Sequence, residues 1–141
     1  TGITEPGSLP SLQTYQAPNN QITGQIPDFT GCTNLRSLTL RNNQLTSYKV
    51  GAFSKLYRIN FIDLKFNNLT QTDLDNILVD LLDNWTSINR GGVSINLKNQ
   101  TNSGGSLAFP SEIGYAAART LASKGWSIGL SGGIPPEPTE V

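Results

Sequence analysis

Apolar residues recur at a constant offset in the first half of the chain. The segments NLRSLTLRNNQL at 34–45 and RINFIDLKFNNL at 58–69 carry apolar residues and one asparagine at the same positions, 24 residues apart. A weaker copy, 23 residues before the first, runs from Leu12 to Ile22. Apolar residues two positions apart lie on the same face of a β-strand, because side chains alternate. Each copy therefore predicts one short strand, in repeats near 12–22, 35–45 and 59–69.

Each copy also carries an asparagine three positions after the second apolar residue of its strand. These asparagines are Asn20, Asn43 and Asn67. An asparagine amide at the point where a strand turns away can bond the exposed backbone of its own and neighbouring repeats. We expect the three side chains to stack as a structural ladder and to bind no ligand.

The period changes after Leu69. Thr70 and Asp73 form a predicted helix cap, and apolar residues then follow at helical spacing from Leu74 to Trp85. A second helix is predicted from about Ser111 to Lys124, where Ser111 can cap it and Gly125 ends it. Alternating apolar residues before and after this helix predict strands in further repeats near 93–100 and 126–131. The last strand leucines are spaced by 33 residues: Leu64, Leu97 and Leu130.

Parallel strands joined in this way place the connecting segments on one face of a sheet. The pattern predicts an α/β solenoid with a curved parallel sheet of about five strands and helices on the convex side of its C-terminal half. The repeat domain is expected to span residues 1–131. Residues 132–141 are rich in Gly, Pro and Glu and are expected to form a flexible tail.

The spacing L-x-x-L-x-L-x-x-N-x-L at 35–45 and 59–69 resembles the leucine-rich-repeat family, and the resemblance covers residues 9–69. The stretch 22–45, with Gly24 and Pro27 in a G-x-I-P pattern, is similar to plant receptor ectodomains. The run 92–129 resembles the C-terminal unit of short bacterial and tailed-phage repeat proteins. That resemblance implies a non-catalytic module on a virion or cell surface, within a larger chain or assembly.

Composition excludes several classes of function. The formal net charge is zero and 14% of residues are charged, which argues against binding of nucleic acid. The chain has no histidine and a single cysteine, Cys32, so the usual catalytic base and a thiolate metal site are both missing. No apolar run is long enough for membrane insertion. We therefore expect no enzymatic activity, no cofactor and no metal, and we expect Cys32 to fill a small space in the core.

Three other sets of residues are candidate sites. The aspartates 73, 75, 80 and 83 lie on the first predicted helix and are expected to form a solvated face rather than a carboxylate pair or calcium site. Ser94 and Lys98 share a strand but face open water, which disfavours a Ser-Lys hydrolase. The glycosylation sequons at Asn68, Asn84 and Asn99 occur about as often as chance predicts in a chain of this composition.

The register of the repeats places one row of side chains from each strand on the exposed sheet face. Arg41, Lys65 and Lys98 should form a column of positive charge, since neighbouring strands are about 4.8 Å apart. Asp63 and Asn96 should lie beside this column, and Phe61 should be an exposed aromatic on the same face. The six residues form the predicted ligand-binding face, for a protein surface or a cell-surface glycan.

Several functions are compatible with these observations. The first is an adhesion or decoration module on a phage virion, and the second is a bacterial surface or secreted protein that mediates protein contacts. A plant-type receptor ectodomain is a third. A structural role is a fourth, in which the open edge of the first strand, near 12–17, contacts another repeat or chain.

Overall fold

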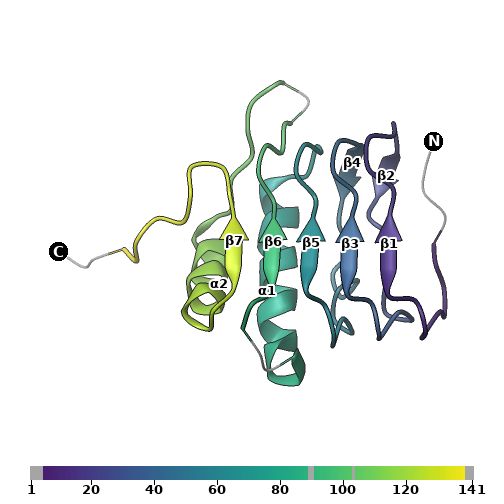
Figure 1. The fold of residues 1–141 in the computed structure, drawn as a ribbon. Helices are drawn as coiled ribbons and strands as arrows, with labels where there is room; N and C mark the ends of the chain where they lie inside the picture. The colour runs from purple at the N-terminus through teal and green to yellow at the C-terminus, as the bar shows by residue number, and fades with distance from the viewer. Residues whose placement is uncertain (1–4, 89–90, 103, 139–141) are drawn as a thin grey trace.

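A computed structural model describes residues 5–88, 91–102 and 104–138. Its main sheet has five parallel strands, which lie side by side in Figure 1. In sheet order these strands are β1 (Thr14–Gln16), β3 (Ser37–Thr39), β5 (Phe61–Asp63), β6 (Ser94–Asn96) and β7 (Ser127–Gly129). Each strand pairs with the strand of the next repeat, as the sequence spacing predicts.

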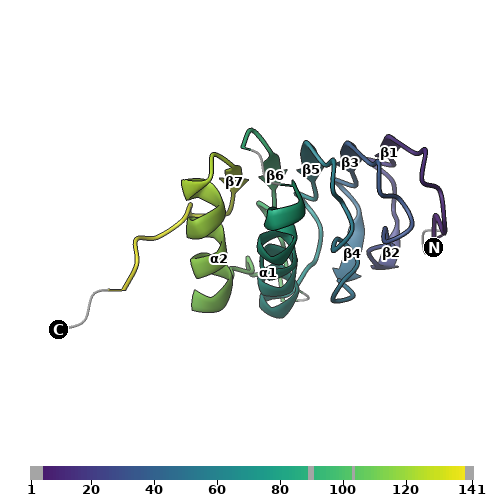
Figure 2. The same cartoon turned by 90° about the horizontal axis from the view of Figure 1, so that it is seen from below.

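A second layer lies behind the main sheet, as Figure 2 shows. It contains the short strands β2 (Thr23–Gln25) and β4 (Gln44–Ser47) in the N-terminal half. In the C-terminal half it contains the helices α1 (Gln71–Ile88) and α2 (Glu112–Ser123). Within the described residues, no element covers the opposite face of the main sheet, which is called the open face below.

The core fills the space between the two layers. The central residue of each inner strand is fully or almost fully buried: Leu38, Ile62 and Ile95. Tyr15 and Ile128, at the same position of the two end strands, are only partly buried, because an end strand has one neighbour instead of two. Cys32 is free and buried in this core, where burial raises the pKa of its thiol.

Helix α1 begins at the predicted cap. The backbone N–H of Thr70 donates to the Asp73 carboxylate at 2.9 Å, and the Asp73 N–H donates to Thr70 Oγ1 at 3.2 Å. This reciprocal pair satisfies two N–H groups that a helix start leaves without partners. The helix continues past Trp85, the last residue of the predicted apolar stripe, to Ile88.

Three of the four aspartates on α1 are internal hydrogen-bond acceptors, so the predicted solvated acidic face is wrong for them. Asp73 accepts from the N–H of Tyr48 at 3.1 Å, and Asp80 accepts from the Tyr48 hydroxyl at 2.7 Å. Asp75 accepts from the N–H of Ser111 at 2.8 Å. Asp83 alone of the four is exposed. The apolar stripe predicted the helix but not which polar side chains another segment would cover.

Helix α2 begins at Ser111, as predicted, and its first turn is also bonded by α1. Ser111 Oγ accepts from the N–H of Ile113, and the Asp75 carboxylate accepts from the N–H of Gly114 at 3.1 Å. A Cβ atom at position 114 would overlap this carboxylate. The glycine therefore lets the two helices approach closely enough for one to cap the other.

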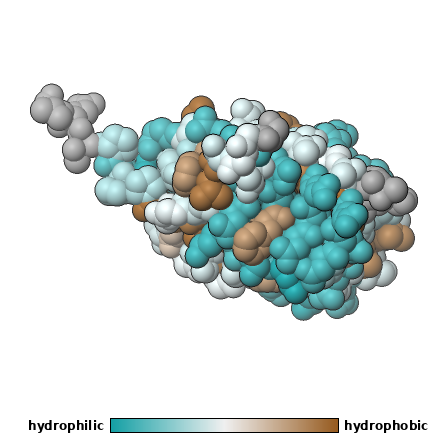
Figure 3. Space-filling view, turned by 90° about the horizontal axis from the view of Figure 1, so that it is seen from above, coloured by the Kyte–Doolittle hydropathy of each residue, from teal (hydrophilic) through white to brown (hydrophobic). Residues whose placement is uncertain are grey.

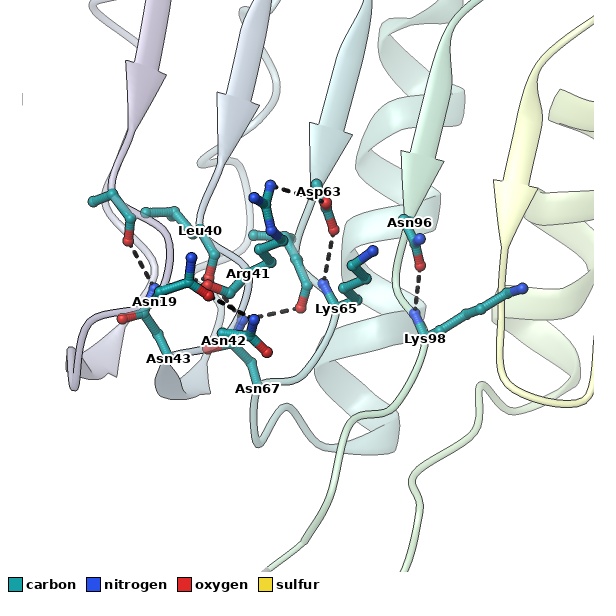
Figure 4. A network of polar contacts seen from close by, with 12 residues as sticks. Asn19, Leu40, Arg41, Asn42, Asn43, Asp63, Lys65, Asn67, Asn96 and Lys98 are labelled. Carbon is teal, nitrogen blue, oxygen red and sulfur yellow. Dashed lines mark hydrogen bonds and ion pairs between the residues drawn. The ribbon is translucent and has the colours of Figure 1, made fainter.

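The repeats are joined by a ladder of side-chain amides, part of which Figure 4 shows. Asn43 Nδ2 donates to the carbonyl of Ala17, and Asn67 Nδ2 donates to that of Leu40, in each case one repeat earlier. Asn20, the first expected member, is exposed and donates only within its own turn, to Pro18 at 3.1 Å. No earlier repeat lies among the described residues to receive it.

Gln100 is a further member of this ladder that sequence analysis missed. It is fully buried, and its Nε2 donates to the carbonyl of Leu64 at 2.7 Å. It occupies the asparagine position of the fourth repeat, three residues after Leu97. The repeat spacing identifies this position, where a glutamine provides the amide group that asparagine provides in the other repeats.

Two further features were not anticipated. Sequence analysis missed the parallel pair β2–β4, because its short strands lack alternation of apolar and polar residues. In the segment expected to be a tail, Ile134 packs against the core and Arg119 donates to the carbonyl of Pro135 at 3.2 Å. Residues 139–141 of that segment lie outside the described residues. Among the helices described, none is long and apolar enough to cross a membrane.

Candidate binding face

Phe61 lies at the centre of the open face. It pairs in register with Ser37 on β3 and with Ser94 on β6, so small polar side chains flank it on both sides. Its exposed fraction is 37%, although it belongs to an inner strand of the sheet. The structure therefore places this aromatic ring where the repeat spacing predicted it, exposed on the open face.

The next row along the open face is less accessible than expected. Thr39 and Asp63 retain only 4% of their surface each, so the expectation that Asp63 is an exposed contact residue is wrong. One Asp63 oxygen accepts from the N–H of Lys65 at 3.2 Å, and the other lies 3.8 Å from an Arg41 guanidinium nitrogen. Asp63 thus orients its neighbours, and its carboxylate has little area left for a ligand.

Arg41 and Lys65 differ in how much of their positive charge is left without a partner in the chain. The charge of Arg41 is partly neutralised by the ion pair with Asp63, and the Arg41 side chain is 37% exposed. Lys65 bonds Asp63 through its backbone, which leaves the ammonium group of its side chain outside that contact. The positive charge of the predicted column is therefore reduced at Arg41, where Figure 4 shows the ion pair with Asp63.

Lys98 and Asn96 repeat the same turn one strand further along. Asn96 Oδ1 accepts from the N–H of Lys98 at 3.0 Å, so an amide replaces the carboxylate of Asp63. Because an amide carries no charge, Asn96 does not neutralise the positive charge of Lys98. The Lys98 side chain is exposed and extends towards β7 (Figure 4).

Phe66 is a candidate contact residue that sequence analysis missed. It has a left-handed backbone conformation with φ of 60°, in the turn that follows β5. The same turn of the other repeats holds Asn19, Asn42 and Asn99, with φ of 58°, 57° and 61°. Asparagine tolerates this conformation, whereas a bulky side chain does so at a cost. The departure from asparagine was visible in the alignment of the repeats.

The edge at which the strands end carries further apolar side chains. Phe66 is 48% exposed, and Leu107 and Phe109, from the segment after β6, are 44% and 41% exposed. Figure 3, which looks onto this edge, shows separate hydrophobic patches on a mostly hydrophilic surface. This edge therefore extends the candidate binding face beyond the six residues that the sequence predicted.

In the part of the chain that the structure describes, no group of three or more His, Cys, Asp and Glu side chains is arranged to hold a metal ion. The sequon residue Asn84 is 5% exposed and donates to the carbonyl of Phe53, a poor position for a glycan.

Comparison with known proteins gives one match. Residues 27–76 match the model of a family described as leucine rich repeat. No curated protein and no solved structure matches the chain. The matched segment includes β3, β4 and β5 and the start of α1. Together with the parallel strands that repeat on either side of it, the match supports a leucine-rich repeat protein, a class whose domains generally mediate protein–protein binding.

Proposed function

We propose that the chain is a non-catalytic module that binds a protein partner through the open face of its main sheet. The observation that carries the proposal is the exposed aromatic ring of Phe61 at the centre of a sheet face that no described element covers. Buried aromatic anchors surrounded by polar contacts dominate the binding energy of many protein interfaces. Phe61 would be such an anchor, with Arg41, Lys65 and Asn96 as polar contacts around it.

A protein partner suits this face better than a nucleic acid. The chain has zero net charge, and Arg41 is already paired with Asp63. Affinity for nucleic acid depends on many free cations, and one of the three cations on this face is already paired. Mixed charges, amides and isolated apolar side chains match the composition of protein interfaces.

The setting of this module is part of the proposal. A virion or extracellular location rests on the resemblance of residues 92–129 to units of bacterial and tailed-phage repeat proteins. Within that setting the partner would be a protein of the host surface or of the same particle. A surface glycan is the competing ligand, and the experiment below separates the two.

The experiment places a photo-cross-linking phenylalanine analogue at position 61, in an extract of the natural source. The control carries it at Ile113, which is 68% exposed on α2, behind the sheet. We expect a protein adduct from position 61 and not from position 113. Phe61→Ala combined with Lys65→Glu should then weaken binding of that protein at least about ten-fold. Unchanged binding, or a saccharide as the bound material, contradicts the proposal.

A further inference from the structure

A hollow of about 550 Å³ lies at the C-terminal end of the main sheet. Lys98, Asn99 and Leu107, from the segment that follows β6, line one side of it. The other side consists of residues 127–133, which include β7 and the turn after it. The hollow therefore lies between the segments that leave the last two strands.

Lys98 is the only ionisable residue among those that line the hollow. Its side chain extends towards β7 in Figure 4. In the equivalent position two repeats earlier, Arg41 is paired with Asp63, whereas no acidic side chain lines this hollow. The hollow therefore presents one positive charge that its own lining does not neutralise.

A hydrogen-bond donor accompanies this charge. Ser131 Oγ accepts from the N–H of Asn99 at 2.8 Å, which leaves its hydroxyl proton free to donate elsewhere. An ammonium group and a hydroxyl can together donate to the oxygens of a small anion.

Glycines keep the hollow free of side chains. Gly129 occupies the row in which the preceding strands carry Thr39, Asp63 and Asn96. A Cβ atom at position 129 would approach the Asn96 side-chain oxygen to 3.2 Å. Gly132 and Gly133, in the turn that closes the hollow, both have φ of 77°, which favours glycine. The opening is therefore a consequence of the sequence at this end of the sheet.

We propose that this hollow binds a carboxylate, carried by an acidic side chain of the protein partner. The proposal rests on the protein-binding function argued above and identifies one feature of the partner. A single positive charge matches one carboxylate better than a phosphate dianion. Leu107, which is 44% exposed, provides an apolar wall for the methylene groups of a glutamate side chain.

The test titrates a probe onto the 15N-labelled chain by itself. The probe is N-acetylglutamate α-amide, which has one carboxylate, and its neutral counterpart is N-acetylglutamine α-amide. We expect saturable shifts of the backbone amide signals of residues 127–133 with the charged probe and none with the neutral one. Lys98→Gln should lower the probe affinity about ten-fold, whereas Lys98→Arg should retain it. The matched control is Lys55→Gln, at an exposed lysine outside the hollow.

Equal shifts with the neutral probe, or full affinity in Lys98→Gln, overturn the proposal. Larger shifts of the same amides with inorganic phosphate than with the charged probe overturn the choice of a carboxylate. Because the titration needs no partner, its result is independent of the cross-linking experiment. Loss of cross-linking at position 61 rejects the proposed function, and loss of probe binding alone rejects only this inference.

Discussion

Gln100 bonds the backbone carbonyl of Leu64 through its side-chain amide, at 2.7 Å and one repeat earlier in the chain. Asn67 bonds Leu40 in the same way at 3.0 Å. The two amides also accept, from the N–H groups of Leu69 and Leu45 respectively. Each amide therefore links consecutive repeats by a donor and an acceptor at once, in an interior from which water is excluded.

Removal of either amide should destabilise the fold strongly. Asn67→Ala and Gln100→Ala each leave buried backbone groups without partners, and we expect a loss of about 2–4 kcal/mol in the free energy of unfolding. Asn20→Ala is the matched control, because Asn20 is exposed and bonds only its own turn. Its cost should stay below about 0.5 kcal/mol. Denaturant unfolding measures all three, and equal effects would show that the ladder does not join the repeats.

The contact between the two helices should depend on one aspartate. Asp75→Ala removes the acceptor for the N–H groups of Ser111 and Gly114 in the first turn of α2. Loss of a helix cap of this kind costs about 1–2 kcal/mol. Asp83→Ala, at the exposed aspartate of the same helix, should have little effect on thermal unfolding. If the two variants have the same melting temperature, Asp75 does not stabilise α2 by capping it.

Stability should fall in alkaline solution because of Tyr48. Burial, followed by the hydrogen bond to Asp80, raises the pKa of this phenol above its ordinary value of 10.0. The folded state therefore keeps a proton that the unfolded state releases, so stability is complete below pH 10 and declines as the pH rises above it. Tyr48→Phe removes this titration. Unfolding free energies between pH 9 and 11 should decline less steeply in the variant, and parallel slopes would contradict the assignment.

Tyr48→Phe should also destabilise the protein at neutral pH. The hydroxyl donates to Asp80 at 2.7 Å and accepts from the N–H of Phe53 at 3.0 Å, so the variant leaves two buried groups short of a partner. We expect a cost of about 1–3 kcal/mol by denaturant unfolding at pH 7. A neutral effect would mean that other groups or water satisfy Asp80 and Phe53 in the variant.

Phe66 should lower the stability of the fold and contribute to partner binding. Phe66→Asn restores the residue that the other repeats carry in this left-handed turn, and we expect it to raise the free energy of unfolding by about 0.5–1 kcal/mol. The same variant should weaken partner binding, because it removes an exposed aromatic from the candidate face. Asn42→Phe is the reciprocal variant and should destabilise by at least as much, because it also removes the hydrogen bond from the Asn42 amide to Asn19. A Phe66→Asn variant that is less stable and binds normally would assign Phe66 to packing instead.

Much of the candidate face could be predicted from the sequence, because the spacing of the repeats determines the register of the strands. Phe61 lies on the open face, where the repeat alignment predicted it, in register with Ser37 and Ser94. The exposed fraction of each side chain could not be predicted in the same way. Asp63 is buried because its own turn and Arg41 cover it, and a pattern of alternation contains no information about such contacts.

The sequence by itself determined the five strands of the main sheet, the two helices and the asparagine positions of the inner repeats. These features depend on short-range periodicity. Because the same periodicity occurs in several repeats, a chance occurrence of the pattern is excluded. Thr70 with Asp73 and Ser111 are local signals of the same kind, since a cap needs only residues of its own turn.

Tertiary structure alone decided which polar residues are internal and where the surface is hollow. Asp75 meets the start of α2, and Asp80 meets Tyr48, across 36 and 32 residues of chain. Whether a carboxylate on a helix is solvated or buried depends on the segment packed over it, which helical spacing does not specify. The hollow beside Lys98 likewise requires Gly129, Leu107 and Ser131 to converge from different segments, and that convergence exists only once the sheet has formed.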